Sequence, residues 1–196
     1  MKYIIMADGQ GGRWKNYLGH PKHLLKIDGE TLLERTVRLL RQYDPLCDVL
    51  ITSHDVRYEV EGAVRYEPQN NILEIDRFTY ELIKPNTTFL YGDTFYSDNA
   101  ISCIVDMEAT DLLFFGNKKA IIAIKINDAD TMKHHIDKIR ELCQVGDITE
   151  GKGWQVYQSF SGMSIGGEKV IANNYIIIDD VTCDFNSPDD LRLFHK

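Results

Sequence analysis

The feature that most constrains the fold is a strand-to-loop junction near the start of the chain. Tyr3 to Met6 is a short apolar run typical of a buried strand, and it ends in a turn that contains Gly9, Gly11 and Gly12. Glycines permit positive φ angles and let backbone N–H groups approach an anion closely, because they carry no Cβ. The junction therefore predicts a cradle for phosphate groups.

Two positive charges follow this turn. Arg13 comes directly after it, and Pro21-Lys22 follows a few residues later. An arginine binds phosphate as a planar fork and a lysine as a point charge, so the pair suits a polyphosphate. The spacing excludes two common cradles. The chain has no Gly-Lys-Ser/Thr for a P-loop, and Trp14 stands where a dinucleotide fingerprint needs its third glycine.

Apolar runs and helical periodicities alternate along the rest of the chain. Strands are predicted over residues 3–6, 48–52, 63–66, 88–91, 111–115, 120–126, 154–157 and 175–178. Helices are predicted over residues 30–43, 72–83, 99–107, 130–145 and 187–191. This alternation predicts an α/β fold, three-layered, with a mostly parallel, twisted mixed sheet. No linker or repeat divides the chain, so we expect a single domain over residues 1–196.

Charge and composition exclude several classes of function. The chain carries 22 basic and 30 acidic residues, a net charge of −8, which argues against a nucleic-acid partner or an anionic membrane. No apolar run is long enough for a signal peptide or a membrane span. The four cysteines are scattered without a C-x-x-C, which is typical of reduced thiols, and we expect a cytoplasmic protein.

In its motifs the chain resembles the nucleotidyltransferase superfamily. The superfamily signature reads roughly L-A-A-G-x-G-x-R, then P-K-x-L-L, then G-x-x-L-L. Residues 6–13 (MADGQGGR), 21–25 (PKHLL) and 29–33 (GETLL) are similar to it, in this order. Residues 184–191 (DFNSPDDL) are also similar to the family's terminal D-I-[DGN]-T-P-E-D-L. The resemblance implies the nucleotide-diphospho-sugar transferase fold. It also implies transfer of a nucleoside monophosphate from an NTP to a phosphorylated small molecule, with release of pyrophosphate.

Such a reaction requires a divalent cation, for which we expect Mg²⁺, and carboxylate oxygens are its usual protein ligands. Asp93 follows a predicted strand and a glycine, where α/β sheets collect ligands, and it matches the family's strand-end Gly-Asp. The terminal match nominates Asp184 as the second metal ligand, with Asn186 as a polar neighbour. The alternative is that Ser187-Pro188-Asp189-Asp190 in this motif serves only to cap the last helix.

The other predicted site residues surround the nucleotide and the acceptor. The resemblance implies that Arg13 and Lys22 hold the β- and γ-phosphates, and that the backbone of the glycine turn faces the nucleotide (Ala7, Asp8, Gly9, Gly11, Gly12). Asn70 and Asn71 are suited either to reading the base or ribose or to capping a helix. Lys125 interrupts an apolar strand, and we interpret it either as a contact to the acceptor's phosphate or as a snorkelling lysine.

Asp8 departs from the superfamily pattern, which has a small apolar residue at this position. A carboxylate beside a triphosphate is unfavourable unless it meets a ribose hydroxyl, a base amine or a metal-bound water. We therefore hypothesise that Asp8 makes a polar contact to the nucleotide or the acceptor.

Several functions remain open on the sequence alone. A sugar 1-phosphate or a phosphocholine-like compound is the expected acceptor, and Asn70-Asn71 slightly favours CTP by resemblance. A molybdenum cofactor guanylyltransferase shares the N-terminal signature. A glycosyltransferase of the same fold usually has Asp-x-Asp, whereas Gly92-Asp93-Thr94 has one carboxylate. A non-catalytic nucleotide-binding domain is disfavoured because Arg13, Lys22, Asp93 and Asp184 are all present.

Overall fold

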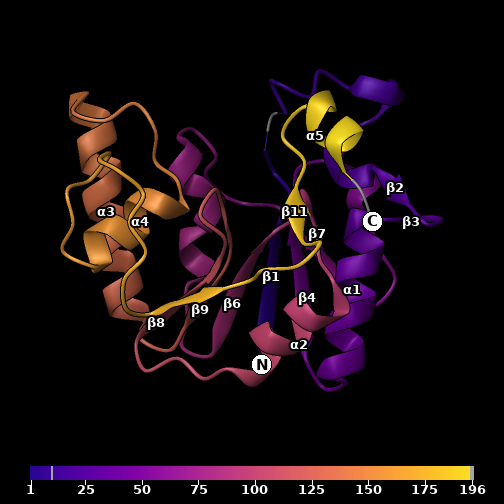
Figure 1. Cartoon of the computed structure of the whole chain (residues 1–196), viewed down its shortest axis with the longest axis horizontal. Helices are drawn as coiled ribbons and strands as arrows, with labels where there is room; N and C mark the ends of the chain where they lie inside the picture. The colour runs from indigo at the N-terminus through magenta and orange to yellow at the C-terminus, as the bar shows by residue number, and fades with distance from the viewer. Residues whose placement is uncertain (10, 195–196) are drawn as a thin grey trace.

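A seven-stranded sheet forms the centre of the computed structural model, which describes residues 1–9 and 11–194 (Figure 1). Gln10, in the predicted glycine turn, lies outside the described residues. The strand order is β10-β8-β9-β6-β1-β4-β5. The strands are β1 Lys2–Met6, β4 Asp48–Thr52, β5 Val64–Tyr66, β6 Thr87–Tyr91, β8 Leu112–Gly116, β9 Ile121–Ile126 and β10 Tyr175–Ile177. Two small sheets pair β2 Lys26–Ile27 with β3 Glu30–Thr31, and β7 Thr94–Phe95 with β11 Cys183–Asp184.

The central sheet is mostly parallel. β1 pairs in parallel with β4 and β6, β4 with β5, and β8 with β10. Only β9 runs the other way among these strands, antiparallel to β6 and β8. The predicted mixed, mostly parallel sheet is confirmed. The carboxyl ends of β1, β4, β5 and β6 therefore lie at one edge of the sheet, which is the edge where open α/β sheets generally bind ligands.

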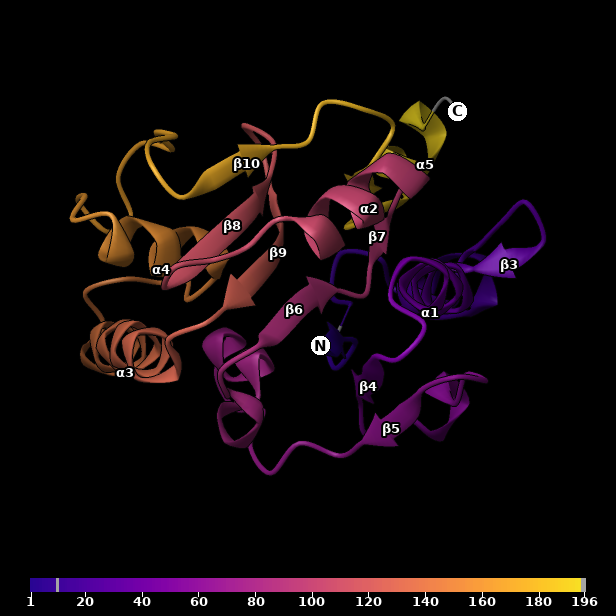
Figure 2. The same ribbon diagram turned by 90° about the horizontal axis from the view of Figure 1, so that it is seen from below.

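Helices cover both faces of the sheet (Figure 2). α1 Leu32–Tyr43 and α2 Asp98–Asp106 lie on one face, and α3 Ala129–Val145 and α4 Gly153–Phe160 lie on the other. Side chains of β1 alternate between the two faces of the sheet. Tyr3 and Ile5 pack in the core with α1 and α2. Ile4 and Met6 pack in the core with α3 and α4. The predicted three-layer α/β/α arrangement is confirmed. None of the helices in the described part of the chain is long and apolar enough to cross a membrane.

The segment predicted as a strand at residues 154–157 is the helix α4, so that prediction was wrong. Its aromatic residues favour strands locally, but Trp154, Tyr157 and Phe160 recur at a spacing of three, which places them on one side of a helix. Tyr157 and Phe160 both pack against Phe114 of β8. Burial of this aromatic face outweighs the local preference.

The single helix predicted over residues 72–83 was also wrong, because two short 3₁₀ helices, Glu74–Phe78 and Tyr80–Leu82, occupy this segment. The buried carboxylate of Asp76 accepts hydrogen bonds from the backbone N–H groups of Ile72 and Leu73. Arg140 of α3 donates to the same carboxylate at 2.9 Å. These bonds fix the segment against α3 and draw its backbone out of a regular α-helix.

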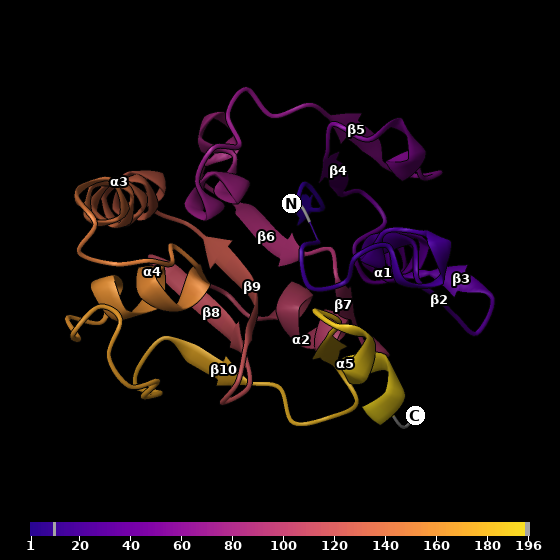
Figure 3. The ribbon, with the colours of Figure 1, turned by 90° about the horizontal axis from the view of Figure 1, so that it is seen from above.

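A third, small core joins the two ends of the chain. It consists of Trp14, Leu25, Leu32, Phe95 and Phe185, all buried. Phe194, just after the closing helix α5 Pro188–Leu193, packs against Phe95 and Phe185. Figure 3 looks onto this end of the molecule, where β11 and α5 lie close to the N-terminal segments. This core holds the C-terminal segment beside the loop that follows β1.

Candidate active site

The centre of the site is a buried ion pair at the carboxyl end of β6. Asp93 follows β6, and Lys22 stands in the short 3₁₀ helix Lys22–Leu24. The Lys22 Nζ donates to Asp93 Oδ2, and the two residues are only 6% and 7% exposed. Burial alone would raise the pKa of Asp93, but the charge of Lys22 and the hydrogen bond from it outweigh burial and hold that pKa below its ordinary value. The structure therefore joins two predicted catalytic residues as a charged pair.

Gly92 positions this pair against β1. Its backbone N–H donates to Met6 O at 2.9 Å. A Cβ on Gly92 would stand 2.8 Å from Met6 O and 3.2 Å from the Cβ of Ala7, so a side chain here would push the two strand ends apart. The absence of a side chain brings Asp93 directly beside the loop that begins at Ala7.

The C-terminal segment adds a second carboxylate. β11 pairs antiparallel with β7, which sets Asp184 opposite Thr94, and Phe185 N donates to Asp93 O at 2.8 Å. The Asn186 side chain donates to Asp184 Oδ2, and its Oδ1 lies 3.5 Å from Lys22 Nζ. Burial, followed by the charge of Asp93, raises the pKa of Asp184. Asp184 and Asn186 are thus in the same polar cluster as Asp93 and Lys22.

This pair of carboxylates has the donor chemistry for Mg²⁺. Hard carboxylate oxygens suit this ion, which usually keeps waters and phosphate oxygens for its remaining positions. The described residues hold no group of three or more His, Cys, Asp or Glu side chains placed for a metal. Asp93 and Asp184 would thus serve only as a partial ligand set, as expected for an ion that shares its shell with a nucleotide.

A cavity of about 460 Å³ opens on the β4 side of the cluster. Its lining includes Ala7, Asp8, Gly9, Gly11, Lys22, His54 and Asn71. Gly12 lines a smaller neighbouring cavity together with Asp8 and Asn71. Gly11 has a φ of +60°, the conformation that the glycine turn was predicted to need. Asn70 is exposed and lines neither cavity, so of the predicted asparagines only Asn71 reaches the nucleotide side.

Asp8 holds two walls of this cavity together. Its carboxylate accepts from the backbone N–H of His54 at 3.0 Å, and lies 2.8 Å from His54 Nδ1. Asn71 Nδ2 donates to Asp8 O at 2.9 Å and to Asp8 Oδ2 at 2.7 Å. These bonds tie the loop after β1 to the segments after β4 and β5. The departure from the family pattern thus has a structural explanation within the chain itself.

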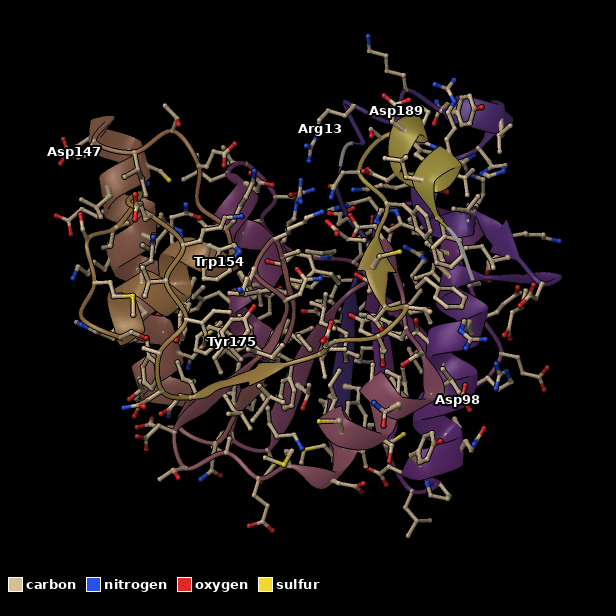
Figure 4. All side chains as sticks on the ribbon, viewed as in Figure 1. Arg13, Asp98, Asp147, Trp154, Tyr175 and Asp189 are labelled. Carbon is tan, nitrogen blue, oxygen red and sulfur yellow. The ribbon has the colours of Figure 1, made fainter. Side chains whose placement is uncertain are left out.

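A second cavity, of about 240 Å³, opens on the other side of the cluster. Asp93, Asp184 and Asn186 line it together with Arg13, which stands at the top of the molecule in Figure 4. Its remaining charged lining consists of Glu74, Arg77, Lys119, Lys152 and Lys169. The sequence analysis missed these four basic residues, because nothing in their local patterns marks them. The one local signal was a lysine between two glycines, Gly151-Lys152-Gly153, just before the mispredicted segment of residues 154–157.

Lys125 does not reach either of these cavities. It pairs with Thr88 near the amino end of β6, and its Nζ donates to Val105 O at 3.0 Å and to Met107 O at 2.6 Å. These carbonyls lie at the end of α2, and the cavity that Lys125 does line also contains Met1 and Asn86. The predicted contact to the acceptor's phosphate therefore has no support in its position, and we read Lys125 as a buried structural lysine.

The fold is that of the nucleotide-diphospho-sugar transferases. No model of a known protein family matches the chain, and no curated protein matches it by sequence. Solved structures do match over nearly the whole chain. One is the CTP:phosphocholine cytidylyltransferase from Streptococcus pneumoniae, with a TM-score of 0.58 and 14% identity over 97% of this chain and 96% of that chain.

Two further matches have the same architecture. The inositol-1-phosphate CTP transferase from T. maritima has a TM-score of 0.56 and 11% identity, over 96% of this chain and 90% of that chain. The nucleoside-diphosphate-sugar pyrophosphorylase from Vibrio cholerae has a TM-score of 0.59 and 15% identity, over 99% of both chains. At these identities the likeness establishes the fold, which is the one that the N-terminal signature predicted.

Proposed function

We propose that this protein is a Mg²⁺-dependent nucleotidyltransferase that joins a nucleoside monophosphate from an NTP to a phosphorylated small molecule. One observation carries the proposal: Lys22, Asp93, Asp184 and Asn186, from three distant segments, form one cluster between two cavities. A purely structural ion pair would not require a neighbouring second carboxylate at the mouth of a cavity. The matching solved structures include a CTP:phosphocholine cytidylyltransferase and an inositol-1-phosphate CTP transferase, which carry out this class of reaction.

The proposed step is a direct displacement at the α-phosphorus. An oxygen of the acceptor's phosphate forms a bond to the α-phosphorus, and the bond from that phosphorus to the α,β-bridging oxygen breaks. Pyrophosphate leaves with the electron pair. Lys22 and Arg13 stabilise charge on the phosphates, and the backbone of residues 7–12 orients the nucleotide. A Mg²⁺ ion held by Asp93 and Asp184 would neutralise phosphate charge.

The hydrogen bonds of Asn71 favour a base with an exocyclic amine. Both partners of its Nδ2 are oxygens of Asp8, so the amide must turn its N–H groups toward Asp8. Among the described residues no donor bonds to its Oδ1, which leaves an acceptor available to a base in the cavity. An acceptor suits the amine of cytosine, adenine or guanine and repels the carbonyl of uracil or thymine. Because two of the solved structures with this fold are CTP transferases, we propose CTP as the first nucleotide to test.

The test is pyrophosphate release with Mg²⁺, each of ATP, CTP, GTP and UTP, and a pool of phosphate monoesters. We expect release with CTP, and a loss of at least about a thousandfold in Asp93→Asn. Circular dichroism of Asp93→Asn must match the wild type, because this change leaves the buried Lys22 without its charged partner. Absence of both release and NTP binding in the wild type would refute the proposed function.

A further inference from the structure

The cavity beside Asp93 and Asp184 is strongly basic in a chain that is acidic overall. Arg13, Arg77, Lys119, Lys152 and Lys169 line it, against three carboxylates, of which Asp93 is already paired with Lys22. The whole chain carries a net charge of −8, so this concentration of basic residues does not follow from composition. A cavity with low-dielectric walls focuses such a field and selects ligands by charge.

The three lysines line this cavity and not the nucleotide cavity, and two of them, Lys119 and Lys169, are bonded to each other. The carbonyl oxygen of Lys119 accepts from Lys169 Nζ at 2.6 Å and from Trp154 Nε1 at 3.2 Å. Lys169 Nζ also lies 5.2 Å from the centre of the Trp154 ring. These contacts join the β8–β9 turn, the start of α4 and the loop before β10 into one surface, which we call the lysine wall (Lys119, Lys152, Lys169).

The positive charge of the lysine wall is only partly balanced. Lys152 forms ion pairs with Glu150 at 2.8 Å and with Glu74 at 3.8 Å. Among the described residues the Lys119 side chain has no ion pair. Burial, followed by the charge of Lys152, lowers the pKa of Lys169, so these two ammonium groups repel each other. An anion placed between them would relieve this repulsion.

The aromatic side chains of the cavity already have partners within the chain. Trp154 stacks on Tyr175 at 5.7 Å and carries Lys169 over its ring. Tyr91 receives a hydrogen bond from Gly153 N, and Phe78 packs edge-on against Tyr91. A choline-like cation is recognised by open aromatic faces and is repelled by lysines. The basic side chains that line this cavity therefore suit an anion and not a choline-like cation.

We infer that the acceptor is a phosphate monoester with a second anionic group, a carboxylate or another phosphate, which binds the lysine wall. This inference rests on the proposed nucleotidyl transfer, because that reaction places the acceptor's reacting phosphate beside Asp93 and Asp184. The body of the acceptor then extends along the cavity toward Lys119, Lys152 and Lys169. The same wall excludes acceptors with a cationic body, such as phosphocholine.

The test uses acceptors that differ only in the second group. Glucose 1-phosphate, glucuronic acid 1-phosphate and glucose 1,6-bisphosphate share one ring, and phosphoethanolamine and O-phosphoserine form an acyclic pair. Binding of each to the whole protein is measured by calorimetry, with phosphocholine as the cationic probe. We expect the acidic member of at least one set to bind about tenfold more tightly than its counterpart, and phosphocholine to bind least. The carboxylate and bisphosphate arms show which anionic group is preferred.

Two variants locate the effect. Lys119→Gln should reduce the preference for the acidic member about threefold to fivefold, and high salt should weaken it in the wild type. Lys118→Gln is the matched control, because Lys118 is the exposed neighbour that does not line the cavity, and it should leave the preference unchanged.

Three outcomes would overturn the inference. One is that acidic and uncharged members bind equally, or that none of the acidic members binds. The second is equal effects of the two lysine variants. The third is that Lys119→Gln weakens NTP binding instead, because the wall would then serve the triphosphate. Pyrophosphate release is measured separately, so a failed acceptor preference with intact release would leave the proposed function standing.

Discussion

His23, the residue after Lys22, is a buried neutral side chain beside the site. It is 2% exposed, and its Nδ1 lies 3.1 Å from the hydroxyl oxygen of Tyr58. Burial lowers the pKa of His23 from its ordinary value of 6.5 to about 4. Between pH 4 and pH 6.5, His23 is therefore protonated in the unfolded chain and neutral in the folded protein. The stability that His23 contributes is therefore complete above pH 6.5 and is lost as the pH falls toward 4.

We expect this residue to make the protein acid-sensitive. Between pH 8 and pH 5, the free energy of unfolding of the wild type should fall by about 2 kcal/mol more than that of His23→Gln. Urea unfolding at the two pH values measures the difference. Tyr58→Phe is the control, since it removes the hydroxyl but keeps the buried imidazole, and it should retain the pH dependence. Identical pH dependence in the wild type and His23→Gln would contradict this account.

Asp8 illustrates how one residue is explained only by its neighbours. Its carboxylate accepts hydrogen bonds from His54 N and Asn71 Nδ2. The second of these bonds orients the Asn71 amide, which lines the nucleotide-side cavity of about 460 Å³. Asp8 also lines the cavity, so the contact with a ligand that the sequence suggested stays a prediction. In the function proposed above, Asp8 would in addition position Asn71 toward the base.

At the scale of secondary-structure elements, the close approach of β1 and β6 decides where the Asp93 carboxylate lies. In Gly92→Ala the new Cβ would meet Met6 O, so the ends of the two strands must separate. We expect a loss of about 1–3 kcal/mol in the free energy of unfolding, as for other overpacked sites. Pyrophosphate release should also fall, because Asp93 moves with the strand end.

Gly12→Ala is the matched control for stability. A Cβ on Gly12 has no atom within 4 Å, so we expect the free energy of unfolding to change by less than about 0.5 kcal/mol. Urea unfolding of both variants measures the contrast. If Gly92→Ala proves as stable as Gly12→Ala, the close approach of the strands is not what Gly92 provides.

Two elements show why local patterns mislead. The α4 segment has strand-favouring aromatics and the 72–83 segment has a helical pattern, yet the first is a helix and the second is two 3₁₀ helices. In both cases a contact with α3 or β8 decides the result, through Asp76 and Arg140 or through Tyr157 and Phe114. Tertiary packing therefore overrides propensity in short elements.

At the scale of the whole molecule, a bound nucleotide would connect segments that are far apart in the chain. The cluster contains Lys22 from the N-terminal segment, Asp93 from the turn after β6, and Asp184 from β11. A ligand that contacts all three binds only the folded protein and stabilises it by mass action, by about 2.7 kcal/mol at a hundred times its dissociation constant.

We accordingly expect CTP with Mg²⁺ to raise the midpoint of urea unfolding. The same nucleotide with a chelator in place of the metal should raise it less, and Asp184→Asn should remove most of the difference between the two conditions. Inorganic salt at equal ionic strength is the control for general electrostatics. A midpoint that does not respond to millimolar CTP with Mg²⁺ would show that the assembled cluster is not a nucleotide site.

The sequence by itself determined the α/β class and the glycine loop after the first strand, and it marked Lys22 and Asp93 separately as candidate site residues. These features depend on short-range patterns: an apolar run that must be buried, a turn that only glycine permits, and helices such as α1 and α3 with continuous apolar stripes. Such patterns act within a few residues, so they can be read along the chain.

Only the tertiary structure decided which distant residues meet. The pairing of β11 with β7 brings Asp184 to Asp93, and the packing of α4 brings Lys152 and Trp154 to the same cavity. The tertiary structure also decided between the two readings of Lys125. This lysine lies at the opposite end of β6 from the site, so it does not contact the acceptor there. No local pattern encodes these placements, because they depend on the register of strands and the packing of faces that are separated by up to about 160 residues, as between Lys22 and Asn186.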